Sequence, residues 1–343
     1  KKNDNIYIYI YIYMGFRFNI CNIVISKFKK ITKFCCRKKD VNIQINCNNN
    51  TLINTKTEND VILPQYINIK TLGTGGSSIV YKAQNMISKK NYICKRVSKT
   101  SSGLREINIL KKLPTSRFFP KYKDDILDNN RISIITEYIE GVELFAWFKT
   151  NYCDNKRRLP YIILKQFLIE MLTAINILNN HNLCHLDIKF ENIILQKPDT
   201  NRPLDFKLVL IDYEMAHLYT DKLEKLSCAC GTVGYTPLEI YQGYYHKNSD
   251  IWSVGICLWI MLTGELPFSH SKKIYKDGEN YNIDIFIFPN EYHKRCKKKH
   301  DISDYYFDMV SNMLQISYND RPTVEELLDN LNDNNCNSIK ANT

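Results

Sequence analysis

The stretch His185-Leu186-Asp187-Ile188-Lys189-Phe190-Glu191-Asn192 decides how this chain folds and which chemistry it can perform. A second motif, Ile211-Asp212-Tyr213-Glu214, follows it, and Asp212 comes 20 positions after Asn192 (212 − 192). An Asp can accept the proton of a hydroxyl group and a Lys can neutralise a phosphate, while an Asn and a second Asp can hold Mg²⁺. Each residue is ordinary by itself, but the ordered set predicts transfer of a phosphoryl group.

The composition is that of a globular chain with an excess of positive charge. The 343 residues are 44% hydrophobic, which allows a sizeable core, and the net charge is +11. The basic clusters at residues 27–39 and 294–299 are interpreted as solvated surface, with no nucleic acid as a partner. The twelve cysteines form no CxxC pair and have no His at zinc-ligand spacing, so free thiols in a reducing compartment are expected.

Residues 1–60 differ from the rest and are expected to be a low-complexity basic extension, either disordered or membrane-associating. Residues 6–25 have about the length that a membrane span needs, roughly 20 residues. However, Arg17 lies inside this stretch and would cost about 2.5–3.5 kcal/mol near the bilayer centre. A span would leave the downstream part in the cytoplasm, which is also the compartment expected without one.

The remaining pattern predicts an α+β fold with two lobes, at 61–139 and 140–335, followed by a tail at 336–343. The first lobe alternates apolar residues with strand period. Its one helix, at 104–113, is expected to place Leu104, Ile107, Leu110 and Leu113 on one apolar, inward face. The second lobe has apolar residues at helical spacing. The expected strands are 61–63, 66–69, 79–81, 92–94 and 132–139, and the expected later helices are 161–180, 250–263, 304–315 and 323–331.

A glycine-rich stretch, Leu72-Gly73-Thr74-Gly75-Gly76-Ser77-Ser78-Ile79-Val80, lies between two expected strands. Glycines let the backbone approach phosphates closely, although most such turns bind nothing. No GxxxxGK[ST] motif is present, which argues against a P-loop nucleotidase. A strand follows the glycines in place of a helix, which argues against a dinucleotide-binding fold.

Together these motifs resemble the eukaryotic protein kinase superfamily, and within it the calmodulin-dependent type of serine/threonine kinase. The resemblance covers about residues 63–335 and implies a small five-stranded N-lobe with one helix and a larger, mainly helical C-lobe. It implies ATP and Mg²⁺ as cofactors and a protein as substrate. A monomer is expected as well, and the basic N-terminal segment is expected to be the part that could contact a membrane.

The resemblance assigns a role to each matching residue. Asp187 would orient and deprotonate the substrate hydroxyl, Lys189 would neutralise the γ-phosphate, and Asn192 and Asp212 would hold Mg²⁺. Lys95 would hold the α- and β-phosphates and pair with Glu106. The residues assigned to the nucleotide site are Leu72, Gly73, Gly75, Val80, Lys95, Glu106, Thr136, Glu137, Ile139 and Ile194.

Matches farther along support the resemblance. Thr232 stands where a Thr bonds the catalytic Asp and Lys in serine/threonine kinases. Glu239 is expected to form a buried pair with Arg321, and Asp250 is expected to anchor the backbone of the catalytic loop. Glu143 stands where some family members contact the ribose or a basic substrate residue.

Several residues depart from the family pattern. Leu186 replaces an Arg that binds a phosphorylated activation loop, and Cys228 occupies the usual phosphorylation site, so we expect activity without that phosphorylation. Glu214 replaces a Gly, and is expected to restrict the motion of this motif. Ile93 replaces a small residue beneath the adenine. These departures leave open the alternative of a pseudokinase scaffold that binds nucleotide or protein partners without catalysis.

Overall fold

The computed structural model describes residues 65–74, 78–155, 157–196, 205–220, 222–227, 230–268, 275–276, 280–281 and 286–333. Several expectations fall outside these ranges. They concern the N-terminal extension at 1–60, the strand at 61–63, Gly75 of the glycine-rich turn, Cys228 and the tail at 336–343.

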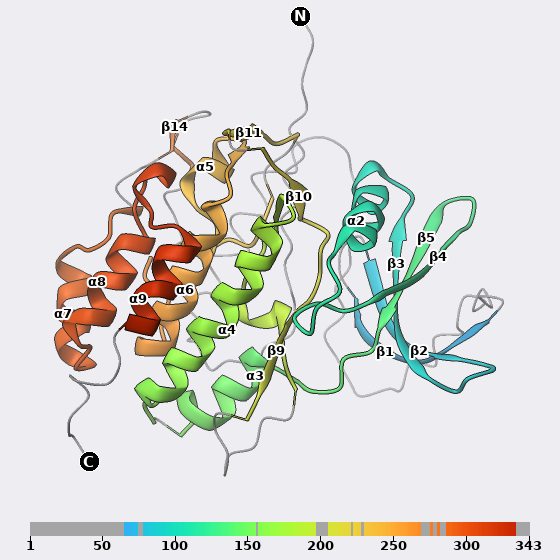
Figure 1. The fold of residues 1–343 in the computed structure, drawn as a ribbon, viewed down its shortest axis with the longest axis horizontal. Helices are drawn as coiled ribbons and strands as arrows, with labels where there is room; N and C mark the ends of the chain where they lie inside the picture. Colours follow the sequence, from blue (N-terminus) through green and yellow to red (C-terminus); the bar gives the residue numbers. More distant parts are fainter. Residues whose placement is uncertain are drawn as a thin grey trace, which may run out of the picture. The chain divides into compact units, whose positions relative to one another are not determined.

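The first lobe is built on a five-stranded antiparallel sheet with one helix beside it, and this prediction is confirmed (Figure 1). The strands lie in the order β1-β2-β3-β5-β4. Their register places Gly73, Val80, Lys95 and Ile134 in one row across the sheet. The row brings the glycine-rich turn next to Lys95. The strands are β1 (Tyr66–Thr74), β2 (Ser78–Asn85), β3 (Asn91–Ser98), β4 (Tyr122–Leu127) and β5 (Arg131–Glu137).

Helix α2 (Ser101–Lys112) begins after Thr100, whose side chain accepts a hydrogen bond from the backbone N–H of Gly103. The helix packs so closely on β3 that a Cβ atom at Gly103 would lie 2.9 Å from Val97 Cγ2. The buried face therefore includes Gly103, Glu106, Ile107 and Leu110. The expectation that Leu104 is buried is wrong, because the close approach at Gly103 turns Leu104 outward, where it is 44% exposed.

The second lobe is mainly helical, as predicted, and helix α6 (Ser249–Thr263) runs through its core. Both tryptophans of α6, Trp252 and Trp259, are fully buried, and the helix ends at Gly264 with φ +76°. Around it lie α4 (Tyr161–Asn179) and α8 (Asp304–Met313), and α9 (Val324–Asp333) packs on α4 (Figure 1). The smaller helical elements are α3 (Leu144–Phe148), a π-helical turn (Lys149–Cys153), α5 (Leu238–Tyr241) and 3₁₀ turns at Phe190–Asn192 and Tyr318–Asp320.

Short strands complete the second lobe. A three-stranded sheet has the order β6-β8-β9, and the other pairs are β7 with β10, β11 with β12, and β13 with β14. Helix α4 is long and apolar enough to cross a membrane, but more than half of it is buried against its neighbours, as in the core of a lobe. The strands are β6 (Val142–Glu143), β7 (Leu183–Cys184), β8 (Ile193–Gln196), β9 (Lys207–Leu210), β10 (His217–Leu218), β11 (Glu224–Lys225), β12 (Tyr244–Tyr245), β13 (Tyr275–Lys276) and β14 (Asn280–Tyr281).

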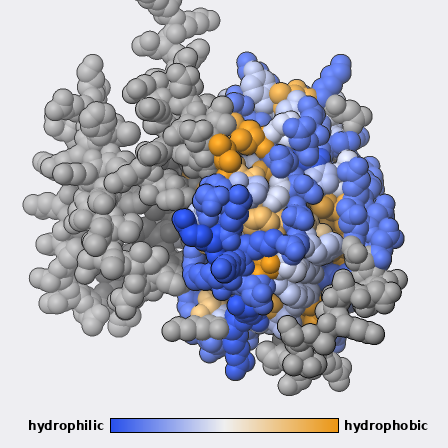
Figure 2. Space-filling model, turned by 90° about the vertical axis from the view of Figure 1, so that its left-hand side faces the viewer, coloured by the Kyte–Doolittle hydropathy of each residue, from blue (hydrophilic) through white to orange (hydrophobic). Residues whose placement is uncertain are grey.

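Helix α7 (Glu291–Lys299) was not predicted, because its sequence is dominated by charge. Asn290 caps it, and His293 completes a reciprocal capping box with the backbone N–H of Asn290. His293 and Cys296 are buried, whereas four basic residues point to solvent on a largely hydrophilic face (Figure 2). These four are Lys294, Arg295, Lys298 and Lys299.

The connection between α2 and β4 fastens the two lobes together. Leu210 donates its backbone N–H to the carbonyl of Phe118 over 2.8 Å. Arg117 forms two hydrogen bonds with the carboxylate of Glu170 on α4, at 2.7 and 2.6 Å. Because Leu210 ends β9 just before Asp212, these contacts hold the sheet lobe against the segment that carries the second motif.

Candidate active site

The loop from His185 to Asn192 is anchored by hydrogen bonds to helix α6. The carboxylate of Asp250 accepts the backbone N–H groups of His185 and Leu186, at 2.7 and 2.8 Å. Leu186 adopts the left-handed conformation, with φ +62°. Burial raises the pKa of Asp250, and the two N–H donors oppose this rise. A buried acceptor thus fixes the backbone on which Asp187 is mounted.

Asp187 lies at the centre of a network that joins four side chains. The Thr232 hydroxyl donates to Asp187 Oδ1 over 2.6 Å, and Lys189 Nζ lies 3.0 Å from Asp187 Oδ2. Lys189 also donates to Thr232 Oγ1 over 2.7 Å. Asn192 donates its side-chain amide to Asp187 Oδ2 over 2.9 Å. The network orients a carboxylate and an ammonium side by side, as a proton acceptor and a phosphate-binding group require.

Asn192 and Asp212 are brought together by the hairpin of β8 and β9. Asn192 immediately precedes β8, and the N–H of Ile211 donates to the carbonyl of Asn192 over 2.9 Å. Asp212 follows with φ +66°, in the left-handed region. The side-chain nitrogen of Asn192 is engaged by Asp187, so its amide oxygen is the atom that can face a metal. One carboxylate and one amide oxygen fit Mg²⁺, which is bound by few protein ligands together with phosphate oxygens.

Lys95 is surrounded by three carboxylates. Its Nζ lies 2.9 Å from Glu106 Oε1, 2.8 Å from Asp212 Oδ1 and 3.1 Å from Glu214 Oε2. Burial alone would lower the pKa of Lys95, but Asp212, Glu106 and Glu214 together raise it well above its ordinary value. Burial raises the pKa of Glu106 to about 7, against the opposing effect of Lys95. The protein atoms around the partly exposed Asp212 would also raise its pKa by desolvation, but Lys95 lowers it to about 2.

Most of the described residues that were assigned to the nucleotide lie on strands of the two lobes. Leu72 and Gly73 lie on β1, Val80 lies on β2 opposite Lys95, and Thr136 on β5 pairs with Ile93 on β3. Glu137 ends β5, and Ile139 follows in the connection to the second lobe. Ile194 on β8 pairs with Glu143 on β6.

The Glu137 N–H donates to the carbonyl of Lys121 over 2.9 Å. An N–H donor for adenine must therefore come from another residue of the connection between the lobes, such as Ile139.

Comparison with known proteins gives the family. The model of the protein kinase domain matches residues 66–331, which is most of the chain. The chain belongs to the protein kinase family. The matched residues contain both lobes of the kinase domain and every described residue of the transfer site.

Relatives of the kinase domain are serine/threonine kinases. The chain is 28% identical over 274 residues to the probable serine/threonine-protein kinase MARK-B of Dictyostelium discoideum, which covers 76% of this chain and 35% of that protein. It is 30% identical over 294 residues to the serine/threonine-protein kinase cds1 of Schizosaccharomyces pombe, covering 80% and 58%. Calcium-dependent protein kinase 4 of Plasmodium berghei matches at 28% over 269 residues, covering 76% and 47%. The chain thus spans only part of the length of these relatives.

The kinase domain contains the expected pair between Glu239 and Arg321. The guanidinium forms two hydrogen bonds with the carboxylate, at 2.6 and 2.9 Å, and both side chains are buried. Ser249 donates to the same carboxylate over 2.8 Å, and Arg321 also donates to the carbonyl of Gln315. The pair therefore ties the end of the activation segment to the start of α6 and to the turn before α9.

Leu186, which stands where the family has an Arg, is buried in an apolar cluster with the activation segment. We call this group the Leu186 cluster; it comprises Cys184, Leu186, Tyr219, Leu226, Ile240 and Tyr245, with Met215 and Cys230 packed against it. Two short strand pairs, β7 with β10 and β11 with β12, frame the cluster. The residue that would have bound a phosphate is thus part of a hydrophobic contact.

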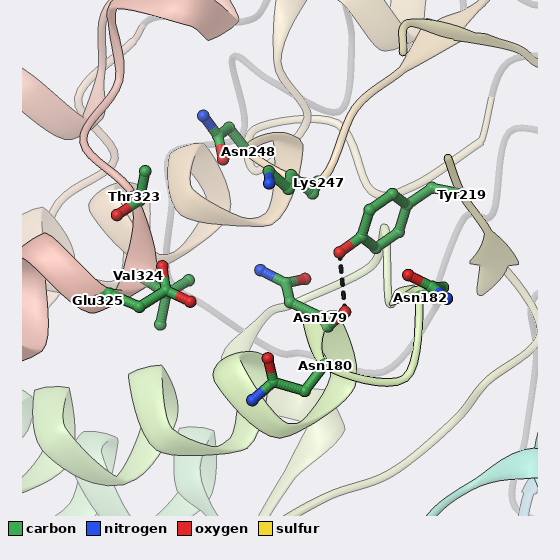
Figure 3. A pocket seen from close by; sticks show the side chains of 9 residues that line it. All are labelled: Asn179, Asn180, Asn182, Tyr219, Lys247, Asn248, Thr323, Val324 and Glu325. Atoms are coloured by element: carbon green, nitrogen blue, oxygen red, sulfur yellow. Dashed lines mark hydrogen bonds between the residues drawn. The ribbon is translucent and has the colours of Figure 1, made fainter. Parts of the chain in front are cut away.

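A separate polar hollow of about 290 Å³ lies between the end of α4, β10 and the start of α9 (Figure 3). Tyr219 donates its hydroxyl proton to the carbonyl of Asn179 at its edge, over 2.8 Å. The residues that line it are Asn179, Asn180, Asn182, Tyr219, Lys247, Asn248, Thr323, Val324 and Glu325. It contains no residue that the sequence assigned to phosphoryl transfer.

Two contacts of the site had no counterpart in the sequence analysis. The Glu214 carboxylate reaches Lys95, and the Arg105 Nη2 donates to the backbone carbonyl of Glu214 over 3.0 Å. A signal for the first contact was present, because an ionisable residue replaced a glycine beside the metal ligand Asp212. The second could not be found, since Arg105 looks like any solvent-facing residue of a helix.

Proposed function

We propose that this chain is a serine/threonine protein kinase that transfers the γ-phosphoryl group of ATP to protein hydroxyl groups with Mg²⁺. The observation that carries this proposal is the network of Asp187, Lys189 and Thr232, with Asn192 bonded to the same carboxylate. A site that had lost its function would have no reason to keep these groups in register.

Each side chain has a definite part in the proposed reaction. Mg²⁺, held by Asn192 and Asp212, would neutralise phosphate charge when bound. Asp187 orients the attacking hydroxyl and accepts its proton, while Lys189 stabilises the charge on the transferred group. Lys95 binds the phosphates that stay behind. Positioning and charge stabilisation supply most of the rate in such a reaction.

The experiment compares the purified full chain with its Asp187→Asn variant, using labelled MgATP and a generic protein substrate. We expect transfer to serine or threonine by the wild type and a loss of at least about a thousandfold in the variant, the scale of removing a catalytic base together with its charge. Asp308→Asn is the matched control, because Asp308 is exposed on α8. Equal transfer by the wild type and Asp187→Asn would reject the enzyme and leave the nucleotide-binding scaffold.

We also propose that the activation segment is ordered without phosphorylation. The Leu186 cluster supports this, because burial of carbon side chains supplies the contact that an Arg and a phosphate would otherwise make. We expect the chain to keep its activity after phosphatase treatment and in a Ser227→Ala variant. Activity that depends strictly on phosphorylated Ser227 would contradict the idea.

For its setting, we propose a monomer in the cytoplasm that acts on protein substrates. In the described part of the chain, the cysteines at positions 94, 153, 184, 257 and 296 are free thiols, as in a reducing compartment. Sedimentation of the purified chain tests the monomer. Fractionation of cells tests the location, and would also reveal any membrane contact through the basic N-terminal segment.

A further inference from the structure

The ammonium group of Lys95 has three protons, and each has a carboxylate as its acceptor. The acceptors are Glu106 on α2, Asp212, and Glu214 two positions farther on. When a nucleotide binds with Mg²⁺, Lys95 must donate at least one of its hydrogen bonds to a phosphate oxygen. One of the three carboxylates therefore has to lose its hydrogen bond with Lys95, and the exposure of the side chains indicates which one.

Exposure separates the three acceptors. The Asp212 side chain is 40% exposed, whereas those of Glu214 and Glu106 are 15% and 3% exposed. Asp212 is also the carboxylate assigned to the metal. It is thus the acceptor that can turn toward a metal ion, while Glu106 and Glu214 remain beside Lys95.

Two hydrogen bonds fix the backbone of Glu214 in a position from which its side chain contacts Lys95. Arg105 on α2 donates to the backbone carbonyl of Glu214 over 3.0 Å. The backbone N–H of Glu214 donates to Asp212 Oδ1 over 3.4 Å. Among the described residues, positive φ angles occur at Asp212 but not at Glu214. A side chain at position 214 therefore costs no backbone strain in this conformation, although the family has a glycine there.

We propose that Glu214 is a positioning residue that shares with Glu106 the task of holding Lys95 toward the phosphates. Glu106 reaches Lys95 from α2 and Glu214 reaches it from the activation segment. A glycine at position 214 would leave Glu106 as the single holder once Asp212 turns to the metal. The substitution therefore makes the hold on Lys95 redundant. This inference rests on the proposed function for its role in catalysis.

The experiment is a double-mutant cycle with Glu106→Gln and Glu214→Ala. The dissociation constant of a non-hydrolysable ATP analogue is measured with Mg²⁺ on the full chain, so that no turnover is needed. If two residues share one task, each loss is mild alone and severe together. We expect Glu106→Gln to weaken binding about threefold when Glu214 is present, and at least about tenfold in the Glu214→Ala background.

Three further measurements separate positioning from folding. Each variant is first melted without nucleotide to establish that it is folded, with Glu291→Gln as the control because Glu291 is exposed on α7. Glu214→Asp keeps a carboxylate for Lys95, so in the Glu106→Gln background it should restore most of the binding that Glu214→Ala loses. In turnover, the double variant should lose kcat as well as raise the KM for ATP, since Lys95 also orients the phosphates.

An equal loss from Glu106→Gln in both backgrounds would overturn the inference, and so would a Glu214→Asp variant that behaves like Glu214→Ala in the Glu106→Gln background. Failure of the proposed function looks different. A wild-type chain that transfers no more phosphate than Asp187→Asn would reject the enzyme, while the binding cycle would still decide whether Glu214 holds Lys95.

Discussion

Thr232 donates its hydroxyl proton to Asp187 over 2.6 Å, although 45 positions separate the two residues. The same hydroxyl oxygen accepts from Lys189. One hydroxyl thus sets the distance between a carboxylate and an ammonium that must act on the same reacting group. It also joins the activation segment to the catalytic loop, so the order of one segment decides the geometry of the other.

Replacing Thr232 should therefore damage the reaction more than the fold. Thr232→Val keeps the shape but leaves Asp187 and Lys189 without their shared partner, at a cost of about 1–3 kcal/mol, or roughly 5- to 150-fold in kcat. Thr232→Ser keeps the hydroxyl and should stay within about threefold of the wild type. Steady-state kinetics with a protein substrate would measure both. Equal activity of the Val and Ser variants would show that the hydroxyl does not position the pair.

The pair of Glu239 and Arg321 should carry a large share of the stability. Arg321→Met leaves the Glu239 carboxylate buried without its partner, and we expect a loss of about 3–5 kcal/mol in the free energy of unfolding. Urea denaturation measures it. Arg295→Met, on the exposed face of α7, is the matched control and should stay within about 0.5 kcal/mol. A similar small effect at Arg321 would contradict the assignment.

The Leu186 cluster predicts a graded response at position 186. Leu186→Ala should cost about 2–5 kcal/mol of stability, because it leaves a cavity among the cluster side chains. Leu186→Met conserves the volume and should cost less than about 1.5 kcal/mol. Leu186→Arg, which restores the residue of the family, should be at least as harmful as Leu186→Ala, because it places a charge among apolar groups. A Leu186→Arg variant as stable as the wild type would show that the cluster does not hold the segment.

His293 should make stability depend on pH. Its Nδ1 accepts the N–H of Asn290 at 3.1 Å, and its Nε2 lies 2.7 Å from the carbonyl of Pro267, so the neutral ring suits both contacts. Burial lowers its pKa from the ordinary 6.5. The stabilisation is thus present above pH 6.5 and is lost as the pH falls through the lowered pKa.

Melting temperatures between pH 8 and pH 4.5 would measure this dependence. A His293→Gln variant, which cannot gain the proton, should lose less on acidification than the wild type. Parallel curves for the two proteins would contradict the role of His293.

Much of this fold follows from local patterns that the sequence displays. The apolar residues of the strand before Glu137 and of the helix at 161–179 recur with the period of their element, because the same faces are buried. Such a period can be read within a short window of the sequence. The fixed order of Asp187, Asn192 and Asp212 is also local, because a single hairpin, β8 with β9, brings them together. These features could be predicted without knowledge of any distant contact.

The remaining features depend on contacts between distant segments. Helix α7 escaped prediction because its two buried residues, His293 and Cys296, are too few to mark a face. The exposure of Leu104 depends on how closely Gly103 approaches β3, which no periodicity reveals. The reach of Glu214 to Lys95 spans 119 positions. The partner of Glu214 lies far outside any local window, and the other two features leave no periodic signal in the sequence.

The packing of Leu186 has a consequence for how such an enzyme could be turned off. Its contacts in the cluster are between carbon and sulfur atoms and rings, and no phosphatase can remove them. On the proposed function, the number of competent molecules would follow the number of folded ones. The total kinase activity would then be set by the rates at which the cell makes and degrades the chain. Degradation by a protease, and not removal of a phosphate by a phosphatase, would turn the enzyme off.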